Sequence, residues 1–401
     1  MYLLLTFTII ITNAQVNLVS NPSFENLLSC PYAYGQINKA ENWNFLITGG
    51  GGTPDLYSSC CTQPNLCGIP NNISGTSFQY AKSGNNYVGL SCYASNLPEL
   101  REYIQYSFSN NLISNHNYCI KIYVNLSNHS TARINTIGAY FDNGSVLTLS
   151  SHRIAYYDSM QTLITPQFYN RTSILDDTLN WMLLEGRFTA TGNETYITLG
   201  NFLPDSLSNI FLYNPGPTGN YHSYYYIDDV SVIDISTPAF AGNDTSITAG
   251  DSIYLGRPSE IGLDEACVWF LNGIPIDTVA GIMVAPDSST TYILQQTICG
   301  NVQYDSVTVT VDKGTGISAL NKKDRFEVYP NPSNGEIWLK LEDFIDHAEL
   351  KLYNINGMMV YQERIYNPGI HKIIYEFENG VYVISLKTKR GTIEEKVVII
   401  R

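Results

Sequence analysis

The stretch YYYIDDVSV, at residues 224–232, consists almost entirely of residues that favour β-strands, with an acidic pair at its centre. Side chains alternate between the two faces of a strand, so a regular strand would place Asp228 and Asp229 on opposite faces. A carboxylate inside a sheet is costly unless a partner neutralises it. We expect that partner to be a bound cation, shared with Glu25 near the start of the same domain.

Short strand-like runs surround this stretch throughout residues 16–236, and Gly, Asn, Pro and Ser separate them. Examples are 87–90, 118–126 and 181–188, and no helical period is sustained. Many antiparallel strands in a segment of this length predict an all-β domain, a β-sandwich or jelly roll. Residues 148–178 are less regular, and we interpret them as an inserted loop region.

Two further β-domains follow the first. Residues 239–312 predict a small sandwich that resembles the immunoglobulin-like repeats of bacterial surface proteins, with Cys267 and a Trp on a central strand. Residues 319–401 predict a third sandwich, because the Asn-Gly pairs at 356–357 and 379–380 are hairpin signals between apolar runs.

Charge is distributed unevenly along the chain. Residues 313–401 contain 13 basic and 12 acidic side chains, whereas the rest of the chain contains 9 basic and 24 acidic ones. An acidic front part repels phosphate backbones, which argues against a nucleic-acid partner. Neutral partners such as glycans, or cations, fit this balance better. The 30 Tyr residues and the charged share of only 14% suit an extracellular β-rich protein.

The cysteine count indicates disulfides formed in an oxidising compartment, because it is even and the spacing gives no metal-binding pattern. We expect Cys267 and Cys299 to pair, since they are the two cysteines of residues 239–312. The other six allow 15 connectivities, which the sequence leaves open. These six are Cys30, Cys60, Cys61, Cys67, Cys92 and Cys119.

The first residues, 1–15, are typical of a signal peptide. The apolar run at 3–11 is too short to span a bilayer, and Thr12-Asn13-Ala14 offers a small-residue cleavage site. Elsewhere, apolar runs stay well below membrane-spanning length, so we expect no transmembrane segment in the mature chain.

The last domain resembles the type A sorting domain of type IX secretion substrates of the Bacteroidetes. The resemblance rests on YPNP at 329–332, the Asn-Gly turn at 356–357, GVYV at 380–383 and the last strand ending at Arg401. It implies recognition by the type IX translocon and removal of the tail by a surface peptidase. It also implies a secreted or cell-surface location.

The first domain resembles the galactose-binding-like jelly rolls of secreted bacterial proteins, which include carbohydrate-binding modules. NPSFE at 21–25 and YIDDVSV at 226–232 carry this resemblance. In such domains the first and last strands lie together, and a structural calcium often ties them. The resemblance implies Glu25 and Asp228 as calcium ligands, with Asp229 as a further candidate, and oxygen ligands suit this cation.

A glycan site in such a fold would combine an aromatic platform with amide or charged groups. Taken singly, each strand aromatic is more often a core residue than a ligand contact. The candidates for ligand binding are Trp43, Tyr57, Tyr80, Tyr87, Tyr93 and Tyr140, together with Arg101.

Catalytic signatures are missing from the sequence, which contains no GxSxG, HExxH or P-loop motif. Adjacent carboxylates on a regular strand point in opposite directions, so the pair at 228–229 makes no glycosidase dyad by itself. We therefore expect a secreted or cell-surface, non-catalytic binding or adhesion protein, with a glycan as its ligand. A secreted glycan-active hydrolase and a structural protein of the cell envelope or matrix are the alternatives.

Overall fold

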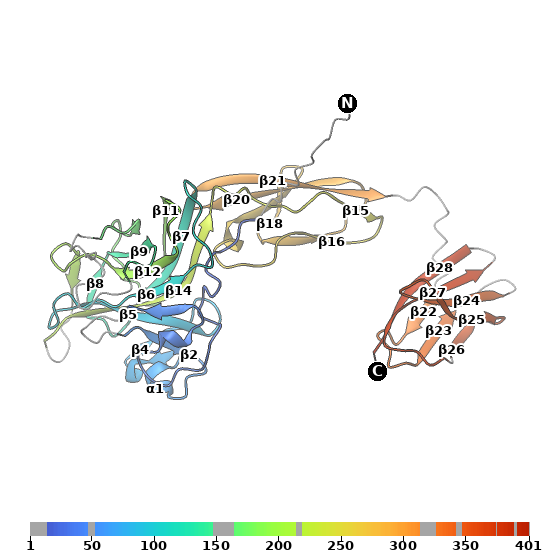
Figure 1. The fold of residues 1–401 in the computed structure, drawn as a ribbon, viewed down its shortest axis with the longest axis horizontal. Helices are drawn as coiled ribbons and strands as arrows, with labels where there is room; N and C mark the ends of the chain where they lie inside the picture. Colours follow the sequence, from blue (N-terminus) through green and yellow to red (C-terminus); the bar gives the residue numbers. More distant parts are fainter. Residues whose placement is uncertain are drawn as a thin grey trace, which may run out of the picture. The chain divides into compact units, whose positions relative to one another are not determined.

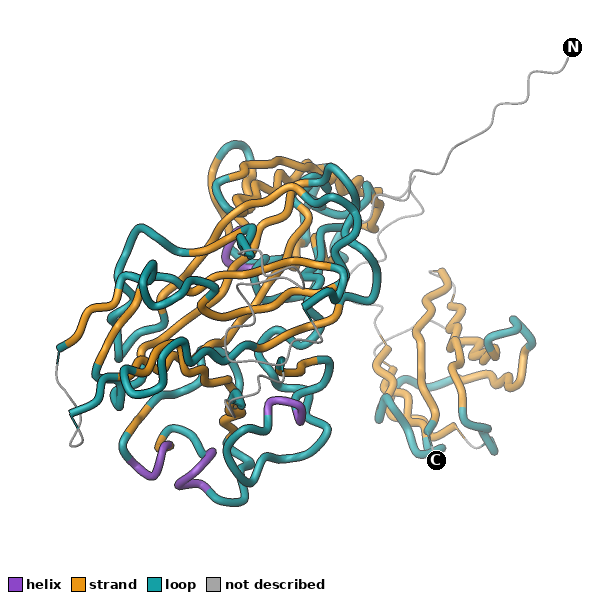
Figure 2. Tube along the Cα trace, turned by 60° about the vertical axis from the view of Figure 1, so that its left-hand side comes forward, coloured by secondary structure: helices purple, strands orange, loops and turns teal. Residues whose placement is uncertain are grey.

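The computed structural model describes residues 14–46, 53–146, 164–213, 219–312, 326–341, 347–373, 375–388 and 391–400. The chain forms two compact units, Met1–Asp312 and Lys313–Arg401 (Figure 1). Strands dominate both units, and the helical segments of the described residues, drawn purple in Figure 2, are three or four residues long. The all-β prediction is confirmed. Residues 1–13 of the expected signal peptide lie outside the described residues.

Two five-stranded antiparallel sheets form the head, the name we give to residues 14–236. One sheet has the order β1 (Trp43–Phe45), β6 (Ile104–Ser107), β12 (Tyr196–Asn201), β9 (Ile137–Asp142) and β10 (Phe168–Tyr169). The other has the order β11 (Met182–Thr189), β7 (Asn117–Leu126), β14 (His222–Asp234), β5 (Asn86–Ala94) and β2 (Asp55–Ser58). Apolar residues of both sheets share one buried core, so the predicted β-sandwich is confirmed.

Smaller elements fill the connections of the head. They are the pairs β3 (Asn71–Asn72) with β4 (Ser77–Phe78) and β8 (Ala132–Ile134) with β13 (Ile210–Leu212), and the turns η1 (Ile37–Lys39), α1 (Pro64–Cys67) and η2 (Ile73–Gly75).

Strand β14 contains the decisive stretch, and it is irregular at the acidic pair. Its pairing with β7 shifts between Asp228 and Ser231, and Asp229 has a φ of 47°. Ile227 faces the core before this bulge and Val230 faces it afterwards, although the two are an odd number of residues apart. The prediction of opposite faces for the two carboxylates is therefore wrong, because the bulge breaks the alternation.

The beginning and the end of the head lie together, as expected. The Leu18 N–H donates to the carbonyl oxygen of Val232 at 2.9 Å, and the Val230 N–H donates to the carbonyl oxygen of Pro22 at 2.9 Å. The segment that follows residue 14 therefore adds to β14 beside the bulge and closes the sandwich.

A second sandwich follows within the same compact unit, and we call it the spacer domain (residues 239–312). Its larger sheet has the order β15 (Thr245–Thr248), β21 (Asn301–Asp312), β20 (Thr290–Ile298), β17 (Cys267–Leu271) and β18 (Ile274–Asp277). The smaller sheet pairs β16 (Ile253–Gly256) with β19 (Gly281–Val284), and the turn η4 (Asp264–Ala266) precedes β17. Trp269 is fully buried in its core.

The spacer domain packs directly on the head. Ile233 of β14 lies in one buried apolar cluster with Leu263 and Ile298 of the spacer domain. Nearby, the ammonium of Lys121 on β7 donates to the carbonyl oxygen of Gly262 at 3.0 Å. The apolar cluster and the buried lysine explain why the two sandwiches form one compact unit.

A disulfide joins the head to the spacer domain, and it corrects the expected pairing. Cys119 of β7 bonds to Cys299, which is 180 residues away, and Cys267 remains a buried free thiol. Cys267 lies on β17 opposite Gln296, inside the spacer core, whereas Cys299 lies in the turn between β20 and β21. The turn faces β7, so Cys299 bonds to Cys119 of the head instead of Cys267 of its own domain.

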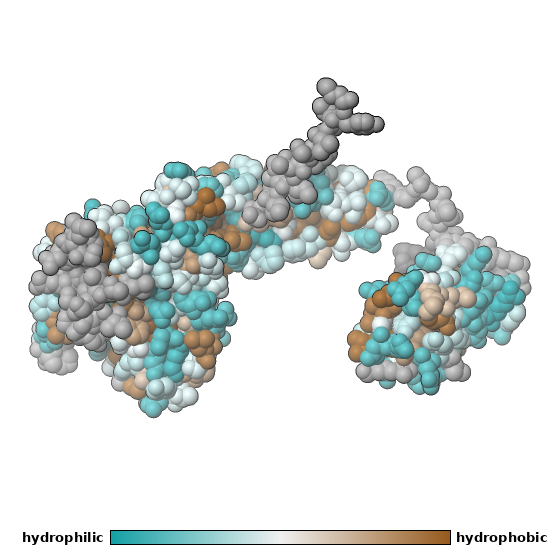
Figure 3. All heavy atoms as spheres, viewed as in Figure 1, coloured by the Kyte–Doolittle hydropathy of each residue, from teal (hydrophilic) through white to brown (hydrophobic). Residues whose placement is uncertain are grey.

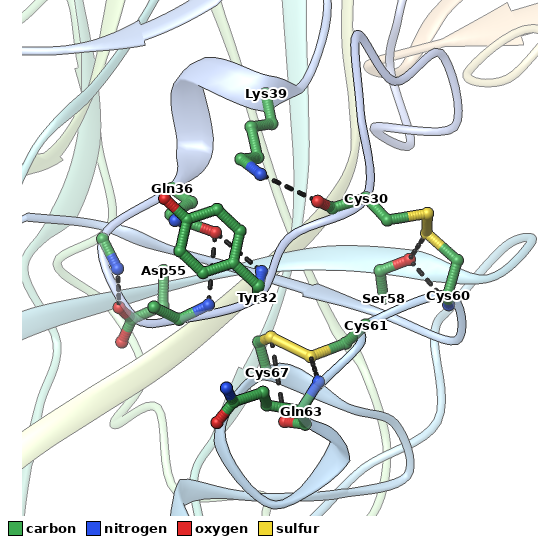
Figure 4. The surroundings of a disulfide bond; sticks show 12 residues. Cys30, Tyr32, Gln36, Lys39, Asp55, Ser58, Cys60, Cys61, Gln63 and Cys67 are labelled. Atoms are coloured by element: carbon green, nitrogen blue, oxygen red, sulfur yellow. Dashed lines mark hydrogen bonds between the residues drawn. A yellow bond between two sulfur atoms is a disulfide. The ribbon is translucent and has the colours of Figure 1, made fainter.

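The remaining cysteines form two bonds and leave one thiol. Cys30 pairs with Cys60 and Cys61 pairs with Cys67, and both bonds fasten the loops around α1 (Figure 4). Cys92 is buried in the head core without a partner. The even number of cysteines therefore predicted one disulfide too many, because Cys92 and Cys267 are small core residues with free thiols.

The second unit is a sandwich of a three-stranded and a four-stranded sheet. The three-stranded sheet has the order β22 (Phe326–Tyr329), β23 (Ile337–Leu341) and β26 (Gly369–Ile373). The four-stranded sheet has the order β25 (Met359–Ile365), β24 (Ala348–Asn354), β27 (Gly380–Thr388) and β28 (Gly391–Ile399). The Asn-Gly pair at 356–357 forms the predicted hairpin between β24 and β25. The pair at 379–380 instead begins β27, whose neighbours are β24 and β28, so the second hairpin prediction is wrong.

Replacing both Cys119 and Cys299 by Ser should lower the free energy of unfolding of the first unit by roughly 2–5 kcal/mol, the usual cost of losing a native disulfide in a small secreted domain. Denaturant unfolding measures this change. Peptide mapping of Cys267→Ala under non-reducing conditions should still find residue 119 linked to residue 299. A map of the unmodified protein that links 267 to 299 would contradict the pairing.

Candidate pocket at the end of the head sheet

A pocket of about 410 Å³ lies at one end of the five-stranded sheet that contains β12, β9 and β10. The end of β12 pairs with the start of β9, and β10 pairs with β9 from the other side. These three strands therefore end at the pocket. The lining residues are Asn135, Thr136, Ile164, Thr165, Pro166, Tyr169, Arg171, Leu203, Leu207 and Asn209.

Close approach of β10 to β9 sets the position of Tyr169. Gly138 is its partner on β9, and a Cβ at Gly138 would lie 2.6 Å from the Cβ of Tyr169 and 2.4 Å from the carbonyl oxygen of Phe168. Contacts this short are essentially never found, so a larger residue would push β10 away. Gly138 thus allows the aromatic ring to stand at the pocket.

Two polar atoms of the pocket lining are buried without a partner. Asn135 and Thr136, which connect β8 to β9, are 5% and 3% exposed. The Nδ2 of Asn135 donates to the carbonyl oxygen of Arg171 at 3.2 Å, but its Oδ1 has no hydrogen-bond partner, nor does the Oγ1 of Thr136. An unpaired buried polar group costs roughly 1–3 kcal/mol, which a ligand that pairs with it recovers.

An aromatic ring and a guanidinium stand together at the same pocket. The guanidinium carbon of Arg171 lies 3.9 Å from the centroid of the Tyr169 ring. A guanidinium at this distance over a ring is held by cation–π attraction and keeps its in-plane N–H groups for other partners. The residues of the lining therefore include an aromatic ring, a cation and two buried oxygen atoms without a hydrogen-bond partner.

Arg101, predicted as a ligand-binding residue, instead supports the wall of the pocket. Its side chain is fully buried and donates to the carbonyl oxygen of Leu203 at 2.8 Å and to the carboxylate of Asp205 at 2.7 Å. These two bonds hold the loop after β12, and Leu203 of that loop lines the pocket. Arg101 is a positioning residue rather than a contact residue.

The predicted aromatic platform does not form, because most of its members are buried. Trp43, Tyr57 and Tyr87 are at most 1% exposed and pack on other aromatic rings. Tyr93 is half-buried against the main core, and Tyr80 is 61% exposed. None of the six predicted aromatic residues is among the described residues that line the pocket.

Tyr140 comes nearest to the pocket among those candidates. It packs against the small cluster that contains Phe202 and Ile164, and Ile164 is a lining residue. The residues that the sequence missed, Tyr169 and Arg171, lie in the irregular segment that was interpreted as an inserted loop. Tyr169 belongs to the short strand β10 and Arg171 follows it, so the irregular pattern of the sequence conceals a strand at this point.

The three predicted metal ligands converge on one loop of the head. Asp228 accepts a hydrogen bond from the Lys82 N–H at 2.7 Å, and Asp229 accepts one from the Ser83 hydroxyl at 2.8 Å. Glu25 accepts the Asn85 N–H at 2.8 Å. Backbone and hydroxyl donors therefore pair with these carboxylates.

Some electrostatic strain remains at the acidic pair. Burial and the neighbouring Asp229 carboxylate raise the pKa of Asp228 well above its usual value. The Oδ1 of Asp229 is buried without a hydrogen-bond partner, and the Lys82 ammonium lies 3.7 Å from its Oδ2. Within the described ranges no three His, Cys, Asp or Glu residues gather as a metal site. The spare buried oxygen of Asp229 is a feature that a calcium ion would satisfy, and calcium stays a prediction.

A calcium ion bound by Glu25, Asp228 and Asp229 would cross-link the two ends of the head, so chelation should lower the melting temperature of the Met1–Asp312 unit. Thermal unfolding with and without a chelator measures the change. Asp251→Asn, in the spacer domain, is the matched control and should respond as the unmodified protein does. An unchanged melting temperature and no metal in native mass spectrometry would contradict this prediction.

Asp55, the first residue of β2, and Glu102, which accepts the Ser91 N–H of β5, form a second buried acidic pair. Burial raises the pKa of Glu102 to about 8, and the Asp55 carboxylate adds to this shift. Burial also raises the pKa of Asp55 to about 6. Hydrogen bonds from the Tyr224 hydroxyl and the Gly35 N–H oppose this rise. Both side chains are 8% exposed.

Glu102 should make the first unit less stable as the pH rises. A carboxyl with a raised folded-state pKa contributes its full stability below its unfolded pKa of about 4.3. That contribution is lost as the pH rises through about 8. Unfolding free energies measured from pH 5 to pH 9 should therefore fall less for Glu102→Gln than for the unmodified protein.

Glu185→Gln is the control for this experiment, since Glu185 is an exposed carboxylate on β11. Equal slopes for the Glu102→Gln variant and the unmodified protein would show that Glu102 does not titrate as its burial requires.

The second unit has a family assignment. Residues 327–400 match the family of secretion system C-terminal sorting domains, Por_Secre_tail. This match confirms the sorting domain of type IX secretion, and it indicates export to the cell surface or the extracellular space. No curated protein matches the chain. No helix of the described residues is long and apolar enough to cross a membrane.

Solved structures resemble the chain only distantly. The CBM22-1 xylan-binding domain from Paenibacillus barcinonensis is 12% identical, with a TM-score of 0.30, over 56% of this chain and 97% of that domain. A cleaved adhesin domain of Lys-gingipain is 12% identical, with a TM-score of 0.29, over 55% of this chain and 98% of that domain. Likeness at this level identifies no ligand.

Proposed function

We propose that the protein is a secreted, non-catalytic glycan-binding protein, and that the pocket beside Tyr169 holds a sugar residue of the glycan. The observation that carries this proposal is the pair of unpartnered oxygens, Asn135 Oδ1 and Thr136 Oγ1, beside an aromatic ring. A sugar presents hydroxyl groups on its rim and C–H groups on its faces. The pocket supplies a partner for each kind of group.

The size of the pocket suits a small part of a glycan. Its volume of about 410 Å³ lies near the lower end of the range for small-molecule sites, which is roughly 300–1,000 Å³. One or two sugar rings fill such a space, and the rest of a chain would continue outside it. Binding to the end or to a side group of a glycan is therefore favoured over binding along its length.

The lining chemistry favours binding over hydrolysis. A glycosidase needs two carboxylates that flank the scissile bond. The described residues of the lining include no Asp or Glu, and the buried pair of Asp55 and Glu102 is not among them. A glycan-active hydrolase and a structural envelope or matrix protein are the outcomes that would replace this proposal.

The other parts of the chain serve delivery and presentation. The sorting domain directs export, and the disulfide between Cys119 and Cys299 ties the head to the spacer domain. Hydrophilic and apolar residues are interspersed over the visible face of the larger unit, without one dominant apolar area (Figure 3). We infer that the spacer domain carries the head at a fixed orientation and leaves its pocket end free.

A glycan array probed with the purified Met1–Asp312 unit tests the proposed function. Tyr169→Ala should weaken binding to any positive glycan by about tenfold or more, since an aromatic contact of this kind contributes on the order of 1 kcal/mol beyond its buried area. Tyr80→Ala is the matched control, because Tyr80 is an exposed aromatic outside the pocket.

Three results would count against the proposal. Unchanged glycan binding by Tyr169→Ala would show that the glycan binds outside this pocket. Release of reducing ends from the bound glycan would favour a hydrolase. Self-association without any glycan binding would favour a structural protein.

A further inference from the structure

Arg171 is the one charged side chain among the described residues that line the pocket. Its guanidinium forms no ion pair with any carboxylate of the described part of the chain, although most charged side chains outside residues 313–401 are acidic. An arginine without an acidic partner at the edge of a binding pocket is available to an anionic ligand.

Arg171 is an exposed residue with one side-chain contact and one backbone contact at the pocket. Its side chain lies over the Tyr169 ring at 3.9 Å, and its backbone carbonyl accepts the Nδ2 donor of Asn135 at 3.2 Å. A guanidinium is planar and carries its donors in a rigid fork, so it loses little freedom for each hydrogen bond that it forms with a two-oxygen group. Ile164, Pro166 and Leu203 supply the apolar part of the same lining.

We propose that the pocket selects a sugar that carries a carboxylate, such as a hexuronic acid, and that Arg171 pairs with this carboxylate. This inference rests on the proposed function. The sugar ring would lie at Tyr169, its carboxylate at the guanidinium of Arg171, and its hydroxyls at the two unpartnered oxygens. A planar carboxylate matches the two parallel donors of a guanidinium better than a neutral hydroxymethyl group does.

The acidic charge of the first unit opposes the approach of a polyanion, but this effect acts at long range. At physiological ionic strength, charges separated by more than about 8 Å are largely screened. A direct contact between Arg171 and one carboxylate escapes most of that screening. The preference should therefore be seen with short oligosaccharides at physiological salt.

Isothermal titration with the Met1–Asp312 unit tests the inference. The probes are an oligogalacturonide, its methyl ester, which lacks the charge and carries one additional methyl group on each carboxyl, and a sulfated galacto-oligosaccharide of equal length. We expect the free acid to bind at least tenfold more tightly than the ester, and the sulfated sugar to bind more weakly than the free acid. Arg171→Gln should remove the preference, so that this variant binds the acid and the ester with equal affinity.

Arg133→Gln is the matched control, because Arg133 also lies over a tyrosine, Tyr213, at 5.5 Å, but outside the pocket lining. This variant should keep the preference. Equal affinity for acid and ester would overturn the carboxylate inference, while loss of ester binding in Tyr169→Ala would still support the glycan pocket. Tighter binding of the sulfated sugar would also overturn it, and no binding of any probe or array glycan would overturn both proposals.

Discussion

The structure depends on how β14 accommodates two adjacent carboxylates at the centre of a sheet. The bulge at Asp228 and Asp229 turns both side chains toward one loop, where N–H and hydroxyl groups pair with them. Beyond the bulge, the strand pairs with the start of the chain and continues to the spacer domain. Closure of the head and its attachment to the next domain therefore both begin at this strand.

The pocket follows from the same closed sandwich. Because β9, β10 and β12 are held in register inside a sheet, the loops at their ends have fixed starting points. Buried Arg101 then fixes the loop after β12 from within. A site on loops thus receives its rigidity from the strands and from one internal arginine, which is what selective recognition of a small polar ligand requires.

The fold could be predicted from the sequence because its signals are local. Alternating apolar residues, Asn-Gly turns and the YPNP motif predicted three sandwiches and the sorting domain, and the family match confirms the latter. The prediction of opposite faces for the acidic pair was wrong, because a bulge between Asp228 and Ser231 breaks the alternation on which it depended. The predicted pairing of Cys299 was wrong because Cys299 meets Cys119 only after the two domains have packed together.

The pocket was harder to predict for the same reason. Asn135 and Tyr169 are far apart in sequence and meet only when β9 and β10 pair, and the larger aromatic residues that attracted notice are needed in the core. Sequence alone cannot separate a core tyrosine such as Tyr87 from a ligand contact, because both have the same side chain. Burial, which depends on the whole fold, separates them.

A crystal structure of the Met1–Asp312 unit with a bound oligosaccharide tests the central claim most directly. The account predicts a sugar ring against Tyr169, with hydroxyl groups within hydrogen-bonding distance of Asn135 Oδ1 and Thr136 Oγ1. An oligosaccharide bound instead on the exposed aromatic pair of Phe78 and Tyr80, with the pocket empty, would contradict it.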